Sequence, residues 1–354
     1  MTLDDQKVYS KYDASDVGFG IENLPEQIRM AWRDTRELEI PRLAGKVQNI
    51  LLAGMGGSGL GAHLLEAALP DRLKIPFFAL RDYALPGWVD SKSLVILSSF
   101  SGNTEEVLTA AAEAKKRRAK VFVICAGGTL AALAKKEKWP IYEFVPGELA
   151  KQPRFGIGLS FGGVIGLLER TGLLKVTEKE LQAMMQAMHE VIDSSAVDVP
   201  TKENPAKTVA EELVGNIVLI FAAEHLTGVA HVMANALNET AKHFATYFAL
   251  PEMNHHLLEG FTNPKFFGPK TKVVMLSSGL YNERTQLRVK LTAELCERQG
   301  ASVVEYVSAG KTKLEEVGEI FQFASYVAWY MAMLKKANTM AIPFVDELKD
   351  RMKK

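Results

Sequence analysis

The sequence predicts an α/β fold with two doubly wound parallel sheets packed together and helical segments at both ends of the chain. Short apolar runs alternate with helical patterns from residue 47 onward, which is typical of a parallel sheet covered by helices on both faces. The alternation stops after Pro146 and resumes near Gly215 in a similar order, which indicates a repeated unit. With 354 residues, the chain is long enough for two domains of ordinary size.

The first segment, residues 1–45, is expected to be mainly helical. An amphipathic pattern over residues 24–38 predicts a helix. Pro25 suits the first turn of that helix, where a backbone N–H would have no helical partner. Residues 9–19 show no regular pattern, and we expect them to be irregular.

The first sheet is predicted within residues 46–150. Its strands are short apolar runs, and its helices show apolar residues at a spacing of three to four. The predicted strands are 49–53, 76–80, 93–98, 121–126 and 141–144, and the predicted helices are 60–69, 104–118 and 130–138.

The second sheet is predicted within residues 206–335, after a helical connection at 151–205. The connection comprises a glycine-rich apolar stretch at 155–168, a charged helix at 177–194 and a proline-bounded linker at 200–205. The predicted elements of the second half are strands at 215–222, 246–250, 272–277 and 302–307, and helices at 228–244, 282–300 and 313–334. The tail, 336–354, is predicted to carry a basic helix at 344–353.

Composition excludes several classes of function. Lys+Arg and Asp+Glu are equal at 42 each, so bulk charge predicts neither a nucleic-acid partner nor a membrane partner. The longest uncharged apolar run, 155–168, is shorter than the ~20 residues of a membrane helix. Cys125 and Cys296 lie far apart and outside any metal-binding spacing, which predicts reduced thiols in a cytoplasmic protein and no structural zinc. The acidic N-terminus does not resemble a signal peptide.

A glycine-rich turn at residues 54–59 follows the first predicted strand, with Gly57 and Ser58 at its centre. Such a turn exposes backbone N–H groups at a helix N-terminus, where an anion is favoured. The turn also fits the dinucleotide pattern Gly-x-Gly-x-x-Gly, but the acidic residue expected roughly 20 positions later is matched only by the distant Asp82. A plain strand-to-helix connection is the third interpretation.

A second turn contains three hydroxyl side chains within six residues. Ser99, Ser101 and Thr104 follow the predicted strand at 93–98, and no acidic residue lies among them. Hydroxyls and N–H groups without carboxylates favour a phosphate monoester over a cation. The two turns together therefore predict a site for a phosphorylated small molecule.

Four further side chains are considered for the chemistry. Glu239 lies in a helical pattern, where a single Glu is usually a solvated surface residue. His255 and His256 lie in a loop-like stretch, and adjacent histidines do not share a helix face, so we expect no two-His metal site. A loop histidine can transfer protons near neutral pH. Arg154 precedes an apolar run, which suits either an ion pair or stabilisation of a developing enediolate.

Taken together, these motifs resemble the bifunctional phosphoglucose/phosphomannose isomerases, a branch of the sugar isomerase (SIS) superfamily. The motifs that carry the resemblance are the 54–59 turn, Ser99-x-Ser101-Gly102-Asn103-Thr104, Gln152-Pro153-Arg154, Asn238-Glu239 and Pro251-Glu252-x-Asn254-His255. The resemblance covers nearly the whole chain. It implies two SIS-type subdomains and a cytoplasmic enzyme of carbohydrate metabolism, in glycolysis or gluconeogenesis.

The resemblance also implies a role for each candidate residue. Ser99, Ser101 and Thr104 would hold the phosphate, and Gly57 and Ser58 would close over the sugar. Glu239 would move a proton between C1 and C2 through a cis-enediol, without metal or cofactor, and Arg154 would stabilise that intermediate. His255 would assist ring opening in the neighbouring subunit of a homodimer. Lys349 is the match to a C-terminal lysine that the family uses, although the family's Asp-Pro pair ahead of the last helix reads Asn338-Thr339 here.

Three other functions remain open. The chain is alternatively an SIS isomerase for an amino-sugar or pentose phosphate, or a sugar-phosphate-binding regulator without catalysis. The third interpretation, a nucleotide-dependent oxidoreductase, is supported by the first glycine turn alone. The joint presence of Glu239 and His255 favours catalysis over the regulator.

Overall fold

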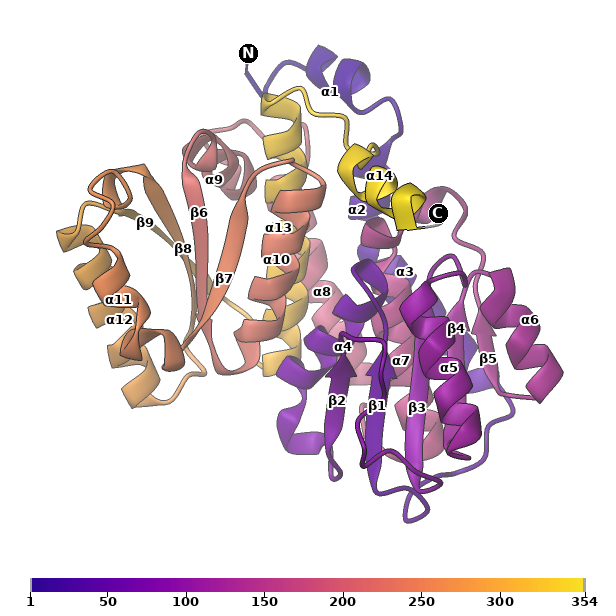
Figure 1. The fold of residues 1–354 in the computed structure, drawn as a ribbon. Helices are drawn as coiled ribbons and strands as arrows, with labels where there is room; N and C mark the ends of the chain where they lie inside the picture. Colours follow the sequence, from indigo (N-terminus) through magenta and orange to yellow (C-terminus); the bar gives the residue numbers. More distant parts are fainter. Residues whose placement is uncertain (1, 353–354) are drawn as a thin grey trace.

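The computed structural model describes residues 2–352 and contains two parallel sheets (Figure 1). The first has five strands in the order β2-β1-β3-β4-β5, and the second has four in the order β7-β6-β8-β9. All their strand pairs are parallel. The strands are β1 (Asn49–Ala53), β2 (Phe77–Leu80), β3 (Ser93–Ser99), β4 (Lys120–Cys125), β5 (Ile141–Glu143), β6 (Ile217–Ala223), β7 (Ala245–Leu250), β8 (Thr271–Ser278) and β9 (Ser302–Ser308). The predicted fold class is confirmed.

The first sheet is buried on both faces, as its continuous apolar strands predict. Every residue of β3 is buried. Val95 and Leu97 join a small core under the helices α5 (Glu105–Lys116) and α6 (Gly128–Glu137). Leu94 and Ile96 point the other way, into a larger core. The helices α4 (Gly57–Ala68) and α7 (Ile157–Thr171) cover this second face, and α3 (Leu24–Glu37) packs on α7.

The larger core continues into the second sheet without interruption. The helices of this half are α8 (Glu178–Ser195), α9 (Pro205–Leu213), α10 (Thr227–Glu239), α11 (Leu257–Gly260), α12 (Glu283–Arg298) and α13 (Lys313–Leu334). α10 packs on β6 and β7, whereas α12 packs on β8 and β9. Figure 1 shows α10 and α13 between the two sheets. None of the helices within residues 2–352 is long and apolar enough to span a bilayer.

Most element bounds agree with the sequence-based expectation, and α13 matches it at both ends. The region expected to be irregular instead holds α1 (Lys7–Tyr12) and α2 (Val17–Glu22), because Asp13 accepts hydrogen bonds from Val17 N and Gly18 N and so fixes the chain between them. The tail helix α14 (Pro343–Met352) lies where a basic helix was predicted, while Lys353 is outside the described residues. The two sheets fall within 46–150 and 206–335, and the limits of those segments stay a prediction.

The glycine-rich stretch after Arg154 forms the helix α7, which the sequence had left unassigned. A Cβ on Gly162 would lie 2.3 Å from Ile28 O, and one on Gly166 would lie 2.0 Å from the Thr35 hydroxyl. The missing side chains therefore let α7 approach α3 closely. The cost of glycine in a helix interior is offset by this close packing.

The interface between α4 and α10 joins the two halves of the molecule. The rings of His63 on α4 and His231 on α10 lie 4.9 Å apart, and His231 stacks on Tyr247 at 4.6 Å. Arg81 donates a hydrogen bond to His63 Nε2 at 3.2 Å. Burial, with the Arg81 charge second, lowers the pKa of His63 to about 3. Burial likewise lowers the pKa of His231 to about 4.

We predict that acid destabilises the protein through His63. Its pKa in the unfolded chain is near 6.5, so the unfolded state binds the proton first and folding stability is lost as pH falls from about 6.5 towards 3. Between pH 7 and pH 5 the loss is about 2 kcal/mol for this residue. Urea unfolding at both pH values should show a smaller pH effect in His63→Asn. The exposed His189 offers the control His189→Asn, and an equal reduction of the pH effect in both variants would contradict the assignment.

Candidate active site

The hydroxyl-rich turn between β3 and α5 is held in shape by its own side chains. Ser99 Oγ and Thr104 Oγ1 lie 2.8 Å apart, and Ser99 Oγ accepts from Gly102 N at 3.1 Å. Gly102 has φ +68°, and a Cβ there would lie 1.8 Å from Gly127 O. Ser101 is exposed at the tip. Thr104 is the N-cap of α5 but makes no side-chain cap bond, so the first-turn N–H groups of α5 remain available to an anion.

The glycine turn is bonded directly to the hydroxyl-rich turn. Ser58 Oγ accepts from Phe100 N at 2.9 Å, and Ser98 Oγ donates to Ser58 O at 2.8 Å. α4 begins at Gly57, three residues earlier than predicted, because Gly56 takes φ +50° and turns the chain directly into the helix. Gly57 and Ser58 therefore lie in the first helical turn.

Gly57 also connects the two turns to Arg154. A Cβ on Gly57 would lie 2.4 Å from Pro153 O and 2.8 Å from Arg154 N, so only glycine permits this approach. Arg154 lies in a 3-10 turn, Pro153–Phe155, and its side chain is 4% exposed. Burial lowers the pKa of Arg154, and the charges of Glu239 and Asp346 oppose that shift.

Glu239 is the last residue of α10, which ends five residues before the predicted end. Its Oε1 lies 3.9 Å from Arg154 Nη1, and its side chain is 33% exposed. The neighbouring Asn238 fixes the helix end, because its amide donates to Ala245 O at 2.7 Å and accepts from Ala245 N at 3.2 Å. The helix therefore stops where Glu239 faces Arg154.

Lys242 is a site residue that sequence reasoning missed. Its ammonium donates to the Glu239 backbone carbonyl. Burial, followed by the charge of Arg154, lowers the pKa of Lys242. Its left-handed backbone, φ +51°, turns the side chain back over the helix end. The sequence carries no signal for this contact beyond the position of Lys242 three residues after Glu239.

A cavity of about 30 Å³ lies against Arg154 and Glu239. Its walls include Ile21 and Leu24 from the N-terminal segment and Ser325 from α13. A cavity of this size has room for one or two water molecules. The N-terminal segment, predicted only as helical material, thus forms part of the wall behind the site.

His255 lies outside this cluster. It is exposed in a 3-10 turn, Glu252–His255, that follows the far end of β7. Asn238 is bonded to Ala245 at the near end of β7, and six residues of strand span roughly 20 Å. His255 therefore does not reach Glu239 of its own chain.

Lys349 is exposed on α14. Asp346, one turn earlier on the same helix, is close enough for its charge to act on Arg154. α14 is thus near the site, although no residue of the helix is buried.

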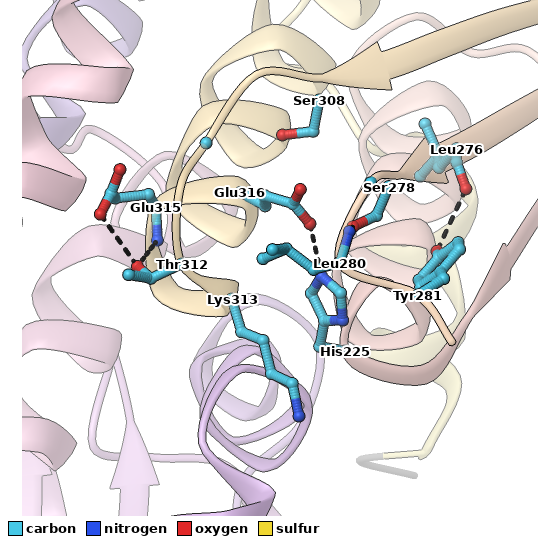
Figure 2. Close-up of polar contacts among 12 residues, drawn as sticks. His225, Leu276, Ser278, Leu280, Tyr281, Ser308, Thr312, Lys313, Glu315 and Glu316 are labelled. Carbon is cyan, nitrogen blue, oxygen red and sulfur yellow. Dashed lines mark hydrogen bonds and ion pairs between the residues drawn. The ribbon is translucent and has the colours of Figure 1, made fainter. Parts of the chain in front are cut away.

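Polar side chains at the strand ends of the second sheet bond within the protein (Figure 2). After β6, His225 Nε2 pairs with Glu316 Oε2 at 2.5 Å, and both side chains are buried. After β8, Ser278 Oγ accepts from Leu280 N at 2.8 Å, and after β9, Ser308 Oγ donates to Glu319 at 2.6 Å. The hydroxyls of Ser278 and Ser308 therefore form hydrogen bonds within the protein. Nowhere in residues 2–352 do three or more His, Cys, Asp or Glu side chains gather as a metal site would require.

Comparison with known proteins shows the family to which the chain belongs. A family model described as SIS domain matches residues 45–138, and one described as bacterial phospho-glucose isomerase C-terminal SIS domain matches residues 202–352. A curated bifunctional phosphoglucose/phosphomannose isomerase from Caldicellulosiruptor bescii is 30% identical over 331 residues, which cover 93% of this chain and 97% of that protein. The chain belongs to the bifunctional phosphoglucose/phosphomannose isomerase family. The family inferred from five sequence motifs is confirmed.

Other relatives of this isomerase family extend the comparison. A protein of the same name from Aquifex aeolicus is 28% identical. The aligned region covers 87% of this chain and 91% of that protein. A D-glucosamine-6-phosphate 4-epimerase from Sulfolobus acidocaldarius is 24% identical, with coverages of 81% and 86%. Among solved structures, a hypothetical protein from Thermus thermophilus superposes with a TM-score of 0.76 at 19% identity, covering 98% of this chain and 92% of its own. That similarity supports the fold.

We predict that Gly102→Ala disrupts the hydroxyl-rich turn. An Ala at positive φ costs about 1–2 kcal/mol, and the clash with Gly127 O adds about 1–3 kcal/mol. Gly45 is the matched control, because it has φ +75° but nothing within 4 Å of its Cβ position. Urea unfolding should show a clearly larger loss of stability for Gly102→Ala than for Gly45→Ala. Equal losses would mean that the contact with Gly127 does not constrain the turn.

Proposed function

We propose that the protein is an aldose–ketose isomerase that interconverts glucose 6-phosphate and mannose 6-phosphate with fructose 6-phosphate. One observation carries the proposal: the hydroxyl-rich turn is joined through Ser58 and Gly57 to the buried Arg154, which faces Glu239 at 3.9 Å. These contacts connect the proposed anion site to the proposed acid–base residue. The names of the most similar relatives supply the substrate class.

The proposed mechanism moves one proton between two carbons. Ser99, Ser101, Thr104 and the α5 N-terminus hold the phosphate, which orients the open-chain sugar without touching the reacting carbons. Glu239 removes the C2 proton of the aldose while the C1 oxygen takes a proton from solvent, which gives a cis-enediol. The same carboxyl then returns the proton to C1, and the C2 hydroxyl releases its proton to solvent as it becomes a carbonyl. Arg154 stabilises the negative charge that develops on the two oxygens.

Both epimers at C2 are accommodated in this scheme. The enediol has no stereocentre at C2, so rotation about C2–C3 before reprotonation gives either glucose or mannose 6-phosphate. No step requires a metal ion or a cofactor.

A homodimer completes the proposed site. His255 is about a strand length from Glu239 of its own chain, so it acts in the site of a second copy, where it assists ring opening. A two-fold arrangement makes this exchange reciprocal. Lys349 on α14 is proposed as the further site lysine of each chain. Cys125 and Cys296 are buried free thiols, which supports a reducing compartment such as the cytoplasm.

The test is a coupled assay on EDTA-treated protein with fructose 6-phosphate, following glucose 6-phosphate and mannose 6-phosphate separately. Formation of both aldose phosphates supports the proposal. Formation of only one keeps the mechanism and restricts the substrate range to that epimer. The relative named as a glucosamine-phosphate epimerase favours a second candidate, an amino-sugar phosphate, so glucosamine 6-phosphate is assayed in parallel. If no sugar phosphate turns over but fructose 6-phosphate raises Tm, the protein is a binding module instead.

We predict that Glu239→Gln lowers kcat by roughly 10²–10⁴-fold and leaves binding of fructose 6-phosphate largely intact, because the phosphate contacts are made elsewhere. The pair Ser101→Ala and Thr104→Ala should instead raise KM or abolish binding. Steady-state kinetics and isothermal titration with fructose 6-phosphate measure both. The exposed Glu259 provides the control Glu259→Gln, and normal turnover in Glu239→Gln would refute the mechanism.

We predict that two inactive variants restore activity when mixed. Glu239→Gln and His255→Asn are unfolded together and refolded at equal concentration. Half of the dimers are then mixed, and each mixed dimer contains one site with both Glu239 and His255, so activity returns to about a quarter of wild type. Separately refolded variants are the control. If His255→Asn retains full activity, or if the mixture stays inactive, His255 does not act across the dimer.

A further inference from the structure

The turn that leads into α14 binds the guanidinium of Arg154 through backbone carbonyls. Arg154 Nη2 donates to Thr339 O at 2.6 Å and to Met340 O at 2.9 Å. Asn338 shapes this turn, because its Oδ1 accepts from Met340 N at 2.9 Å and from Ala341 N at 3.1 Å. Such a side-chain-to-backbone turn orients the two carbonyls in one direction.

The donors of Arg154 divide into two groups. A guanidinium has five N–H groups. The two on Nη2 bond to the tail, whereas Nη1 lies toward Glu239 and the buried Nε has no partner. The tail therefore fixes one end of the guanidinium and leaves its other N–H groups free for an anionic intermediate.

The identity of the acceptors is important for catalysis. A carboxylate at the position of Thr339 O and Met340 O would neutralise the guanidinium, and the cation would then stabilise a developing oxyanion less well. Carbonyl oxygens orient the side chain without cancelling its charge. The burial that lowers the pKa of Arg154 makes the remaining positive charge more effective, because the surroundings screen it less.

The same contact anchors the tail. Thr339 is 2% exposed, but α14 contains no buried residue, and its Phe344 is 86% exposed. Apolar packing of the helix itself contributes little to holding it in place. The bonds from Arg154 to the turn are thus a polar link between the start of α14 and the rest of the molecule.

We propose that Asn338 is a positioning residue of the active site, and that its turn couples the orientation of Arg154 to the order of α14. The catalytic half of this inference rests on the proposed isomerase function. The coupling between Arg154 and the tail does not depend on that function, so the two can be tested separately.

The kinetic experiment compares Asn338→Ala, Asn338→Asp and Arg154→Ala, each alone, with the double variant Asn338→Ala/Arg154→Ala. We expect Asn338→Ala to lower kcat for fructose 6-phosphate by about tenfold or more, with KM within about twofold because the phosphate turn is untouched. Asn338→Asp keeps the acceptor oxygen, and this oxygen bonds Met340 N and Ala341 N rather than the guanidinium, so kcat should stay within about threefold of wild type. In the Arg154→Ala background, Asn338→Ala should have no further effect.

The control is Asn282→Ala, which removes another side-chain-to-backbone hydrogen bond of an Asn: Asn282 is the N-cap of α12, and its Oδ1 accepts from Thr285 N at 3.0 Å. It should leave kcat unchanged. A similar loss in Asn338→Asp, or additive losses in the double variant, would overturn the positioning role.

Hydrogen exchange of residues 338–352, measured by mass spectrometry, tests the coupling without any turnover. Asn338→Ala and Arg154→Ala should both accelerate exchange in α14, whereas Asn338→Asp and Asn282→Ala should not. Unchanged exchange in Arg154→Ala would overturn the coupling. If the wild type does not isomerise any sugar phosphate, the proposed function and the catalytic role of Asn338 both fail. The exchange rates of α14 then decide by themselves whether the Arg154 contact stabilises the tail.

Discussion

The burial of one guanidinium, that of Arg154, constrains most of the structure around it. An uncompensated buried cation is costly, and this one is supported by the tail carbonyls, by Glu239 at 3.9 Å and by the ring of Phe155 at 4.8 Å. Gly57 must lack a side chain so that the backbone of Arg154 can approach the first turn of α4. Through these contacts, segments separated by up to 186 residues in sequence meet at one side chain.

The two sheets contribute unequally to the site. The first supplies both loops that suit a phosphate, whereas the strand ends of the second are filled by internal pairs such as His225 and Glu316. The second half instead contributes the end of α10, which Asn238 ties to the start of β7. In the proposed mechanism, the first half therefore holds the phosphate, and the second half supplies Glu239 and, to a second copy of the chain, His255.

Much of the fold followed from the sequence, because buried parallel strands are continuous apolar runs between turn residues. β1 and α13 match their predicted bounds. α7 was not assigned, because its glycines suggest a loop unless the close approach of α3 is known. Within the site, motifs indicated Arg154 and Glu239. The carbonyls of Thr339 and Met340 carry no signature, since every residue has the same backbone, and Lys242 depends on a helix end that the pattern placed too late.

The glycine-lined contact between α3 and α7 has a consequence for engineering. α7 begins three residues after Arg154, and its spacing from α3 is set by atoms that no side chain can replace at Gly162 and Gly166. A substitution there displaces a whole helix and carries the guanidinium with it, although the altered residue touches no substrate. Libraries aimed at new sugar specificities should therefore leave Gly162 and Gly166 unaltered.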